Sequence, residues 1–258
     1  MQEALSFIEK HSLRVSQVLC LFVVFWVAWP ALRQPRIEED DYRYLHAGQQ
    51  LSIDESASLV EAATVENRWD HLWFMEEEGR IRFFRPTVVI SYGIDWWIWG
   101  DRYAFGLTLT NVLVHLGCTL LVALLLHRWL GSGLPAIMSA MLFAGLWSHG
   151  ECIWYIAGRT DSLAALGFLG AFVLHISRWR AIRWWAVPCF AFGLFTKELV
   201  IAAPLLFLAH DLWVEHRKPR WTRYAVYAVT AAAVILIKHL ALGGVQSDFV
   251  YPYLISPL

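Results

Sequence analysis

The apolar run "RWWAVPCFAFGLFTKELVIAAPLLFLAHDLWV", residues 183–214, decides the fold. A single straight helix over this run would be about 48 Å long, because an α-helix rises by about 1.5 Å per residue. That length exceeds a hydrocarbon core of about 30 Å. The charged pair Lys197-Glu198 would lie at its middle, where charges are costly. The run therefore predicts a helical hairpin that crosses a membrane twice and turns at Lys197-Glu198.

The composition supports a membrane protein. Of the 258 residues, 58% are hydrophobic and 17% are charged, whereas soluble domains carry about 25% charged residues. The 15 tryptophans also fit, because Trp favours the membrane–water interface. A net charge of −1 gives no indication of a nucleic-acid partner, and we expect none. The 4 cysteines show neither metal-ligand spacing nor a disulfide framework.

Apolar runs predict about seven transmembrane helices in a single membrane domain covering residues 1–258. The predicted spans are 15–32, 105–126, 134–148, 160–177, 183–196, 199–214 and 224–242. Several are shorter than the roughly 20 residues that a span needs, so their boundaries are approximate. We interpret the first as an uncleaved signal-anchor helix rather than a cleaved signal peptide, because no small-residue cleavage site follows it. The predicted fold class is an all-α, polytopic membrane helix bundle.

The basic residues predict the orientation, because Lys and Arg accumulate on the cytoplasmic side. Four basic clusters, at residues 10–14, 127–128, 178–183 and 217–223, define that side, and the N-terminus lies with them. Three polar segments then fall on the external or lumenal face. They are the long first loop 33–104, the stretch 149–159 and the Lys197-Glu198 turn.

The first loop is long enough to carry structure of its own. We expect amphipathic juxtamembrane helices in "EEDDYRYLHAGQQL" (38–51) and "SIDESASLVEAATVENRWDHLWFMEEEG" (52–79). The segment "RPTVVISYGIDWWIWG" (85–100) predicts a surface-parallel or re-entrant helix. If it spanned the membrane instead, the downstream topology would invert and the positive-inside pattern would fail.

Asp40 and Asp41 follow the first span closely, in "RIEEDDYRYL". Two adjacent carboxylates at a membrane surface can act as a general base or hold a divalent cation such as Mg²⁺ or Mn²⁺. The alternative is a solvated acidic cap, because Asp and Glu favour helix N-termini.

Two cations, Arg159 and Lys197, lie at the outer ends of apolar helices. A phosphate group on a membrane lipid would lie at that depth, where Arg offers a bidentate fork and Lys a point charge. The alternative is structural, with each side chain snorkelling or pairing with Glu151 or Glu198. Two cations and two carboxylates on the face of the acidic pair favour a binding site.

Arg85, before Pro86, either contacts a donor phosphate or braces the acidic motif, and an ordinary helix start explains it equally well. Asn111 and His115 lie one turn apart on one helix, where we expect them to face the bundle interior and join helices. The sequence contains no Ser-His-Asp set, zinc motif or glycine-rich nucleotide loop, which argues against chemistry on soluble nucleotides.

Four blocks resemble the membrane glycosyltransferases of the GT-C superfamily, in the order typical of that family. They are "EDDYRYL" (39–45), "FRPTVVISYGIDWWIWGDRYAFGLTLTNVLVHLGCTLL" (84–121), "HGECIWYIAGRTDSLAALGFLGAF" (149–172) and "FTKELVIAAPLLFLAHDL" (195–212). The chain looks most similar to the protein O-mannosyltransferases, in particular the transmembrane tetratricopeptide-repeat group and its bacterial relatives. The bacterial likeness implies the inner membrane.

The resemblance implies an inverting enzyme that uses a polyprenyl-phosphate-linked sugar. The sugar, mannose or another hexose, would pass to a hydroxyl of an acceptor protein or glycan among the external membrane lipids. Asp40 or Asp41 would be the base, and Arg159, Lys197 and Arg85 would bind the donor phosphate. The remaining polar groups of the blocks would orient these cations or the acceptor. They are His149, Glu151, Asp161 and Glu198.

Two features depart from the family. Leu146-Trp147 stands where relatives often carry a His-Pro pair, and relatives continue beyond the final "DFVYPYLISPL" with further spans. We therefore keep two alternatives to a minimal enzyme. One is an inactive fragment of such an enzyme, and the other is a protein that binds or transports polyprenyl-phosphate lipids without chemistry.

Overall fold

The computed structural model describes residues 2–37, 41–53, 59–69, 79–131 and 133–242. Its α-helices are α1 (Gln2–Arg33), α2 (Asp41–Ile53), α3 (Leu59–Ala62), α4 (Pro86–Trp99), α5 (Tyr103–Leu130), α6 (Leu134–Ala144), α7 (Gly150–Trp154), α8 (Arg159–His175), α9 (Ala186–Thr196), α10 (Ala203–Ala209) and α11 (Trp221–Ala241). Short turns extend or connect them: η1 (Gly100–Arg102), η2 (Trp147–His149), η3 (Ile156–Gly158), η4 (Ile182–Trp185), η5 (Glu198–Ala202) and η6 (His210–Val214).

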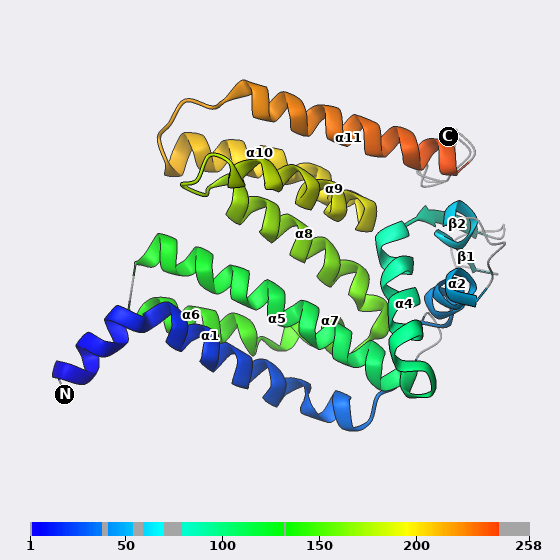
Figure 1. The fold of residues 1–258 in the computed structure, drawn as a ribbon, viewed down its shortest axis with the longest axis horizontal. Coiled ribbons are helices and arrows are strands. Elements are labelled where there is room, and N and C mark those ends of the chain that lie inside the picture. Colours follow the sequence, from blue (N-terminus) through cyan, green and yellow to red (C-terminus); the bar gives the residue numbers. More distant parts are fainter. Residues whose placement is uncertain (1, 38–40, 54–58, 70–78, 132, 243–258) are drawn as a thin grey trace, which may run out of the picture.

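The long helices run side by side, and α4 crosses one end of them (Figure 1). α8 packs between α5 and α9, while α11 packs against α9. We call the end covered by α4 the α4 end. The opposite end holds the N-terminus and the connection from α10 to α11 (Figure 1).

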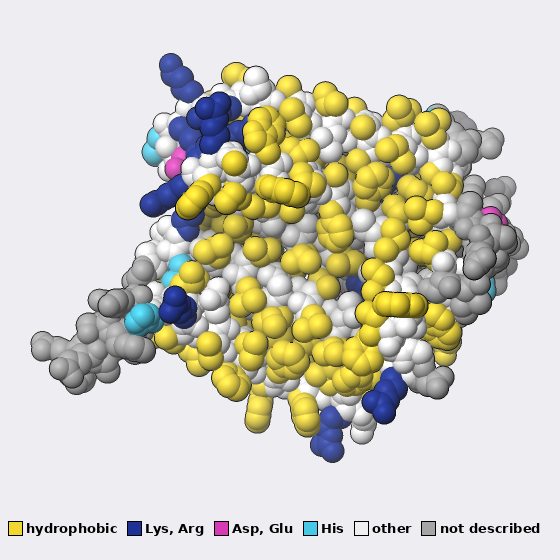
Figure 2. All heavy atoms as spheres, viewed as in Figure 1, with side chains coloured by type: hydrophobic (Ala, Val, Ile, Leu, Met, Phe, Trp, Pro, Cys, Tyr) yellow, Lys and Arg dark blue, Asp and Glu magenta, His cyan; other side chains and the backbone are white. Residues whose placement is uncertain are grey.

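Four helices are long and apolar enough to cross a membrane, which confirms a helical membrane protein. They cover His11–Arg33, Tyr103–Leu130, Ile156–His175 and Trp221–Ala241. The predicted spans 134–148, 183–196 and 199–214 contain shorter helices, and two of these, Leu134–Ala144 and Ile182–Thr196, are apolar helices below spanning length. Hydrophobic side chains cover the visible side of the bundle between its two ends (Figure 2). Such a surface is suited to lipid rather than water.

The chain reverses direction at the predicted turn. α9 ends at Thr196, and Lys197 has an extended backbone, with φ −150° and ψ 139°, before η5 begins at Glu198. Figure 1 shows α9 running toward the α4 end and α10 running back. Lys197-Glu198 is therefore at the end of the bundle and not at its middle, as the hairpin prediction requires.

The first loop departs in part from its prediction. α2 confirms the helix expected in 38–51, although residues 38–40 lie outside the described part of the chain. The helix expected over 52–79 is wrong where strands form, because Thr64–Trp69 and Gly79–Phe84 pair as the antiparallel hairpin β1–β2. The sequences "TVENRW" and "GRIRFF" contain the β-branched and aromatic residues that favour strands, and these outweighed the amphipathic helical pattern.

α4 crosses the end of the bundle, and its surface-parallel or re-entrant placement in a membrane stays a prediction. Its 14 residues span about 21 Å, and α4 is not among the four helices that are long and apolar enough to cross a membrane. It packs against α2 on one side and touches the ends of α5 and α9 on the other, and Figure 1 shows it crossing the long helices. Pro86 occupies its first turn, where the missing N–H of proline costs nothing.

The core between α8, α9, α10 and α11 is aromatic. Phe172, Phe190, Phe207 and Tyr227 are buried there, and the rings of Phe172 and Phe207 stack with centroids 5.4 Å apart. α8 approaches α9 closely through Gly167. A Cβ atom at Gly167 would lie 2.8 Å from the backbone of Gly193, closer than real Cβ contacts come.

Gly167→Ala is therefore expected to lower the thermal midpoint, because the α8–α9 contact has no room for the methyl group. Gly170→Ala, one turn further along α8, is the matched control. Its Cβ would be 3.6 Å from the Cys189 sulfur, an ordinary contact, so the gain in helix propensity should leave stability equal or higher. Thermal unfolding of both variants in detergent measures the difference. Equal midpoints for the two variants would contradict the close approach.

Candidate functional site

The α4 end brings together residues from separate sequence blocks. α2 starts there at Asp41, Arg85 precedes α4, Arg159 starts α8, and Glu198 starts η5. The predicted site residues of four distant segments therefore lie at one end of the bundle. Asp40, the other half of the acidic pair, lies outside the described residues.

Asp41 connects the first loop to the block 149–161. Its side chain is fully buried at the first turn of α2, and Oδ1 accepts a hydrogen bond from the Ala157 backbone N–H at 2.7 Å. Asp41 is therefore no solvated cap. It fixes the position of the loop Tyr155–Gly158 relative to α2.

Two other helices hold the same loop. The Asn111 side chain in α5 donates to the carbonyls of Tyr155 and Ile156, at 3.2 Å and 3.3 Å. The Tyr92 hydroxyl in α4 donates to the Ile156 carbonyl at 2.8 Å. The loop also requires Gly158, because a Cβ there would lie 2.3 Å from the Glu151 carbonyl oxygen. Asn111, which was predicted to join helices, thus helps to hold the backbone of this loop. His115, predicted with it, lies 3.3 Å from the Ala144 carbonyl of α6 and so joins α5 to α6.

Arg159 is completely buried between α4, α5 and α8. Its Nη1 lies 2.7 Å from the Asp95 carboxylate, its Nε donates to the Asn111 side chain at 2.8 Å, and its Nη2 donates to the Leu107 carbonyl at 2.8 Å. The guanidinium also lies 4.3 Å from the centre of the Tyr92 ring. All of its nitrogens are engaged in the protein, so the structure places Arg159 away from any surface that a phosphate can reach.

Sequence reasoning missed Asp95 as the partner of Arg159. Asp95 is buried, and its other oxygen accepts from the Thr110 hydroxyl at 2.6 Å. The alternative that paired Arg159 with Glu151 or Glu198 is wrong, because neither carboxylate reaches into this interior. A carboxylate within the apolar segment 85–100 was the available signal, since a buried charge needs a partner of opposite sign.

Lys197 forms an ion pair with Asp161 on α8, and both side chains are partly exposed. They border a groove of about 380 Å³ whose other lining residues are apolar. These are Ala164, Ala165, Phe168, Leu199, Val200, Ala202, Ala203 and Leu206. Lys197 is thus a cation that borders an apolar groove, and its role in phosphate binding stays a prediction. The prediction that Glu151 or Glu198 orients this cation does not match the observed pair.

Glu198 points the other way, because successive side chains in extended backbone face opposite sides. It pairs with Lys238 of α11, and its other oxygen lies 3.8 Å from the Arg85 guanidinium. Arg85 also donates to the Tyr44 hydroxyl of α2 at 2.9 Å. Burial disfavours ionisation of Glu198, but Lys238 and Arg85 outweigh it and hold the pKa of this carboxyl below its ordinary value.

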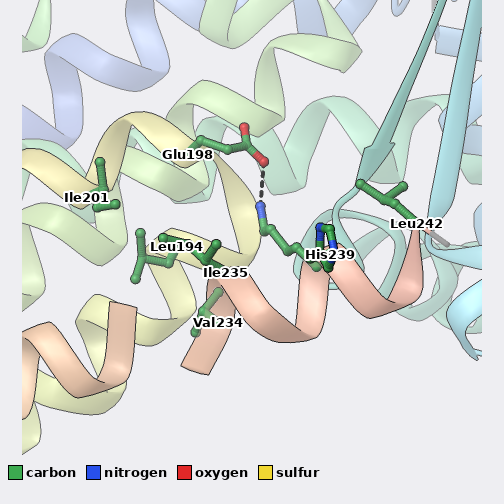
Figure 3. A pocket seen from close by; sticks show the side chains of 8 residues that line it. Leu194, Glu198, Ile201, Val234, Ile235, His239 and Leu242 are labelled. Atoms are coloured by element: carbon green, nitrogen blue, oxygen red, sulfur yellow. Dashed lines mark hydrogen bonds and ion pairs between the residues drawn. The ribbon is translucent and has the colours of Figure 1, made fainter. Parts of the chain in front are cut away.

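Lys238 was not found in the sequence analysis, although it interrupts the apolar run of α11. It lines a second groove of about 390 Å³ between α9 and α11 (Figure 3). Glu198, which is labelled in Figure 3, lines the same groove and forms its ion pair with Lys238 there. The rest of the lining is largely apolar: Leu194, Ile201, Val234, Ile235, His239 and Leu242.

The other two predicted residues lie apart from these charges. The His149 ring packs against Phe143 and His115, with centroids 4.5 Å and 5.2 Å away, and Nδ1 is 3.0 Å from the Phe143 carbonyl. His149 therefore packs the turn before α7. Glu151 is exposed and lines a shallow hollow of about 440 Å³ with Gly150, Trp154 and Tyr155.

Within the ranges that the structure describes, no group of three or more His, Cys, Asp or Glu side chains could hold a metal ion. Among the described residues, the α4 end therefore contains the buried carboxylate of Asp41 and two apolar grooves, one lined by Lys197 and the other by Lys238.

Comparisons with known proteins support the resemblance at the level of activity class. The chain is 26% identical over 168 residues to the human protein O-mannosyl-transferase TMTC2, which is 59% of this chain and 20% of that protein. It is 28% identical over 148 residues to Tmtc2 of Drosophila melanogaster, or 54% of the chain and 16% of the relative. The Xenopus laevis tmtc2 is 24% identical over 168 residues, again 59% and 20%.

The chain spans about a fifth of the length of these curated relatives. No protein-family model matches it. No solved structure matches it either. The chain is therefore similar, over more than half of its length, to proteins named as O-mannosyltransferases.

The Asp95–Arg159 pair generates a stability prediction. Arg159→Leu should lower the free energy of unfolding by about 3–5 kcal/mol, because Asp95 is left buried without a counter-charge. Asp95→Leu should be similarly harmful. The double variant Asp95→Leu/Arg159→Leu should be more stable than either single variant, since it leaves no lone charge. Chemical unfolding of the three variants completes a double-mutant cycle, and additive losses would contradict the buried pair.

Proposed function

We propose that the chain is an inverting glycosyltransferase that moves mannose or another hexose from a polyprenyl-phosphate donor to an acceptor hydroxyl. One observation carries the proposal. At the α4 end, Asp41 of the acidic pair contacts the loop Tyr155–Gly158, and two apolar grooves, each lined by a lysine, lie at the same end. A lipid with an anionic head requires that combination of apolar channel and cation.

The donor would lie with its isoprenoid chain in one of the apolar grooves and its phosphate at a groove mouth. Lys197 and Lys238 are the cations at the two mouths, and Arg85 lies next to the second through Glu198. A phosphate that approached either lysine would compete with Asp161 or Glu198 for the ammonium group. We assign Arg159 a positioning role, because it holds α4, α5 and α8 together beneath the loop Tyr155–Gly158.

The chemistry follows from the acidic motif. Asp40 or Asp41 would take the proton of the acceptor hydroxyl, which for the buried Asp41 requires the acceptor to enter beside the loop at Ala157. The resulting oxygen attacks the anomeric carbon from the side opposite the phosphate, and the bond from that carbon to the phosphate oxygen breaks. The polyprenyl phosphate leaves with the electron pair, so the configuration inverts. In this proposal the chain crosses the membrane seven times, and the α4 end faces the exterior or lumen.

Sugar transfer from polyprenyl-phosphate mannose to a serine- and threonine-containing peptide tests the proposal. Asp41→Asn should lower kcat by about 100-fold or more, because general-base catalysis contributes about 10²–10⁴-fold. Glu215→Gln at the opposite end is the control and should retain the parent rate. Saturable donor binding by the parent without transfer would favour a lipid-binding protein or an inactive fragment instead. Lack of binding would contradict the proposed site.

Lys197 gives a separate prediction for the donor site. Lys197→Gln should raise KM for the donor by about 10–100-fold with little change in kcat, because a charged hydrogen bond to phosphate contributes about 1.5–3 kcal/mol. Lys197→Arg should restore most of the affinity. Arg102→Gln, an exposed cation at the same end, should change neither constant. Steady-state kinetics with varied donor concentration separate the two constants. An unchanged KM in Lys197→Gln would contradict phosphate binding by Lys197 and would favour Lys238 as the residue that binds the donor phosphate.

A further inference from the structure

The end of the bundle opposite α4 carries a concentrated positive charge. The segments 176–185 and 210–223 together contain seven Lys and Arg but only two Asp and Glu residues. We call this region the basic end. Figure 2 shows Lys and Arg side chains gathered where α10 connects to α11, beside a surface that is otherwise hydrophobic. The sequence predicts this end to be cytoplasmic.

Side-chain contacts join the segment 210–223 to His175 at the end of α8, directly before the segment 176–185. Arg223, at the start of α11, donates to the His175 carbonyl at the end of α8, at 3.3 Å. Asp211 is fully buried and accepts from the Tyr224 hydroxyl at 2.8 Å and from Arg217 Nε at 2.9 Å. His175 Nε2 lies 3.3 Å from the same carboxylate. The basic end is therefore an ordered structure rather than two independent loops.

Both carboxylates of the basic end are already paired. Asp211 holds Arg217, and Glu215 lies 3.2 Å from Arg128 of α5. Four exposed cations form no ion pair with any described residue: Arg178, Arg180, Lys218 and Arg220. More positive charge is present than the neighbouring carboxylates can balance.

The interior of the basic end also has too few acceptors for its positive side chains. Arg223 is 5% exposed, and its Nε has no hydrogen-bond partner among the described residues. A buried donor without a partner is costly, so an anion that accepted from it would be stabilised.

Exposed aromatic residues flank these cations. Trp179 and Trp185 are 72% and 67% exposed on one segment, and Trp213 and Trp221 are 75% and 67% exposed on the other. Indole rings favour the headgroup level of a bilayer. The arginines between them would therefore lie among lipid phosphates, which favours a lipid ligand over a soluble acidic protein or a nucleic acid.

We propose that the basic end binds the phosphodiester headgroup of an anionic phospholipid between segments 176–185 and 210–223. The arginine fork matches phosphate oxygens, and basic pockets between helices on the cytoplasmic side of membrane proteins bind such headgroups. The site is separate from the sugar-transfer site at the α4 end and does not depend on it. It would hold the α8–α9 and α10–α11 connections together by neutralising their mutual repulsion.

Native mass spectrometry of the delipidated full chain tests this proposal. Dioleoyl phosphatidylglycerol and dioleoyl phosphatidylcholine have the same acyl chains and differ in headgroup charge. The parent should bind the anionic lipid at least ten-fold more tightly. Arg180→Gln/Arg220→Gln should weaken that binding by about ten-fold or more and leave phosphatidylcholine unchanged, because each basic side chain near an anionic surface contributes about five-fold.

Arg36→Gln/Arg102→Gln removes two exposed arginines away from the basic end and is the matched control, which should keep the parent preference. A second double variant, Arg178→Gln/Lys218→Gln, should show the same loss of binding. Agreement between the two variants would exclude misfolding of the first as the cause of its loss. Equal affinity of the parent for the two lipids, or equal losses in test and control pairs, would overturn the proposal. Displacement of the lipid by millimolar inorganic phosphate would overturn the lipid assignment in favour of a soluble anion.

Discussion

The ion pair between Arg159 and Asp95 is the interaction on which the α4 end depends. Neither side chain reaches water, so each charge is tolerated only because the other is 2.7 Å away. The pair joins the first turn of α8 to α4, and the hydrogen bond to Asn111 adds α5. Three helices that come from separate parts of the sequence are thereby held in one register.

The loop Tyr155–Gly158 takes its position from this arrangement. It leads directly into Arg159, and Asp41, Tyr92 and Asn111 hold its backbone from α2, α4 and α5. A fixed backbone beside an acidic motif can orient reactive groups without further movement, which lowers the entropic cost of catalysis. The buried pair thus supports the proposed chemistry from below the surface, while the partly exposed Lys197 and the buried Lys238 line the grooves.

The two ends of the bundle differ in the balance between positive and negative side chains. At the α4 end, Lys197 and Lys238 each have a carboxylate partner that an anionic ligand would have to replace. At the basic end, the cations outnumber the carboxylates, so a ligand would supply missing charge rather than compete for it. This difference separates a site suited to exchange of a lipid donor from a site suited to a resident lipid.

The sequence by itself determined the helical membrane class, the turn at Lys197-Glu198 and a helix within 38–51. Each rests on local information, namely hydropathy, length and the cost of a charge in an apolar run. The hairpin β1–β2 was missed because its helical and strand patterns compete locally. Only the tertiary structure decided the partners of the charges, pairing Arg159 with Asp95, Lys197 with Asp161 and Glu198 with Lys238. The reason is physical: a charge in an apolar sequence signals that a partner is needed, but helix packing determines which distant residue supplies it.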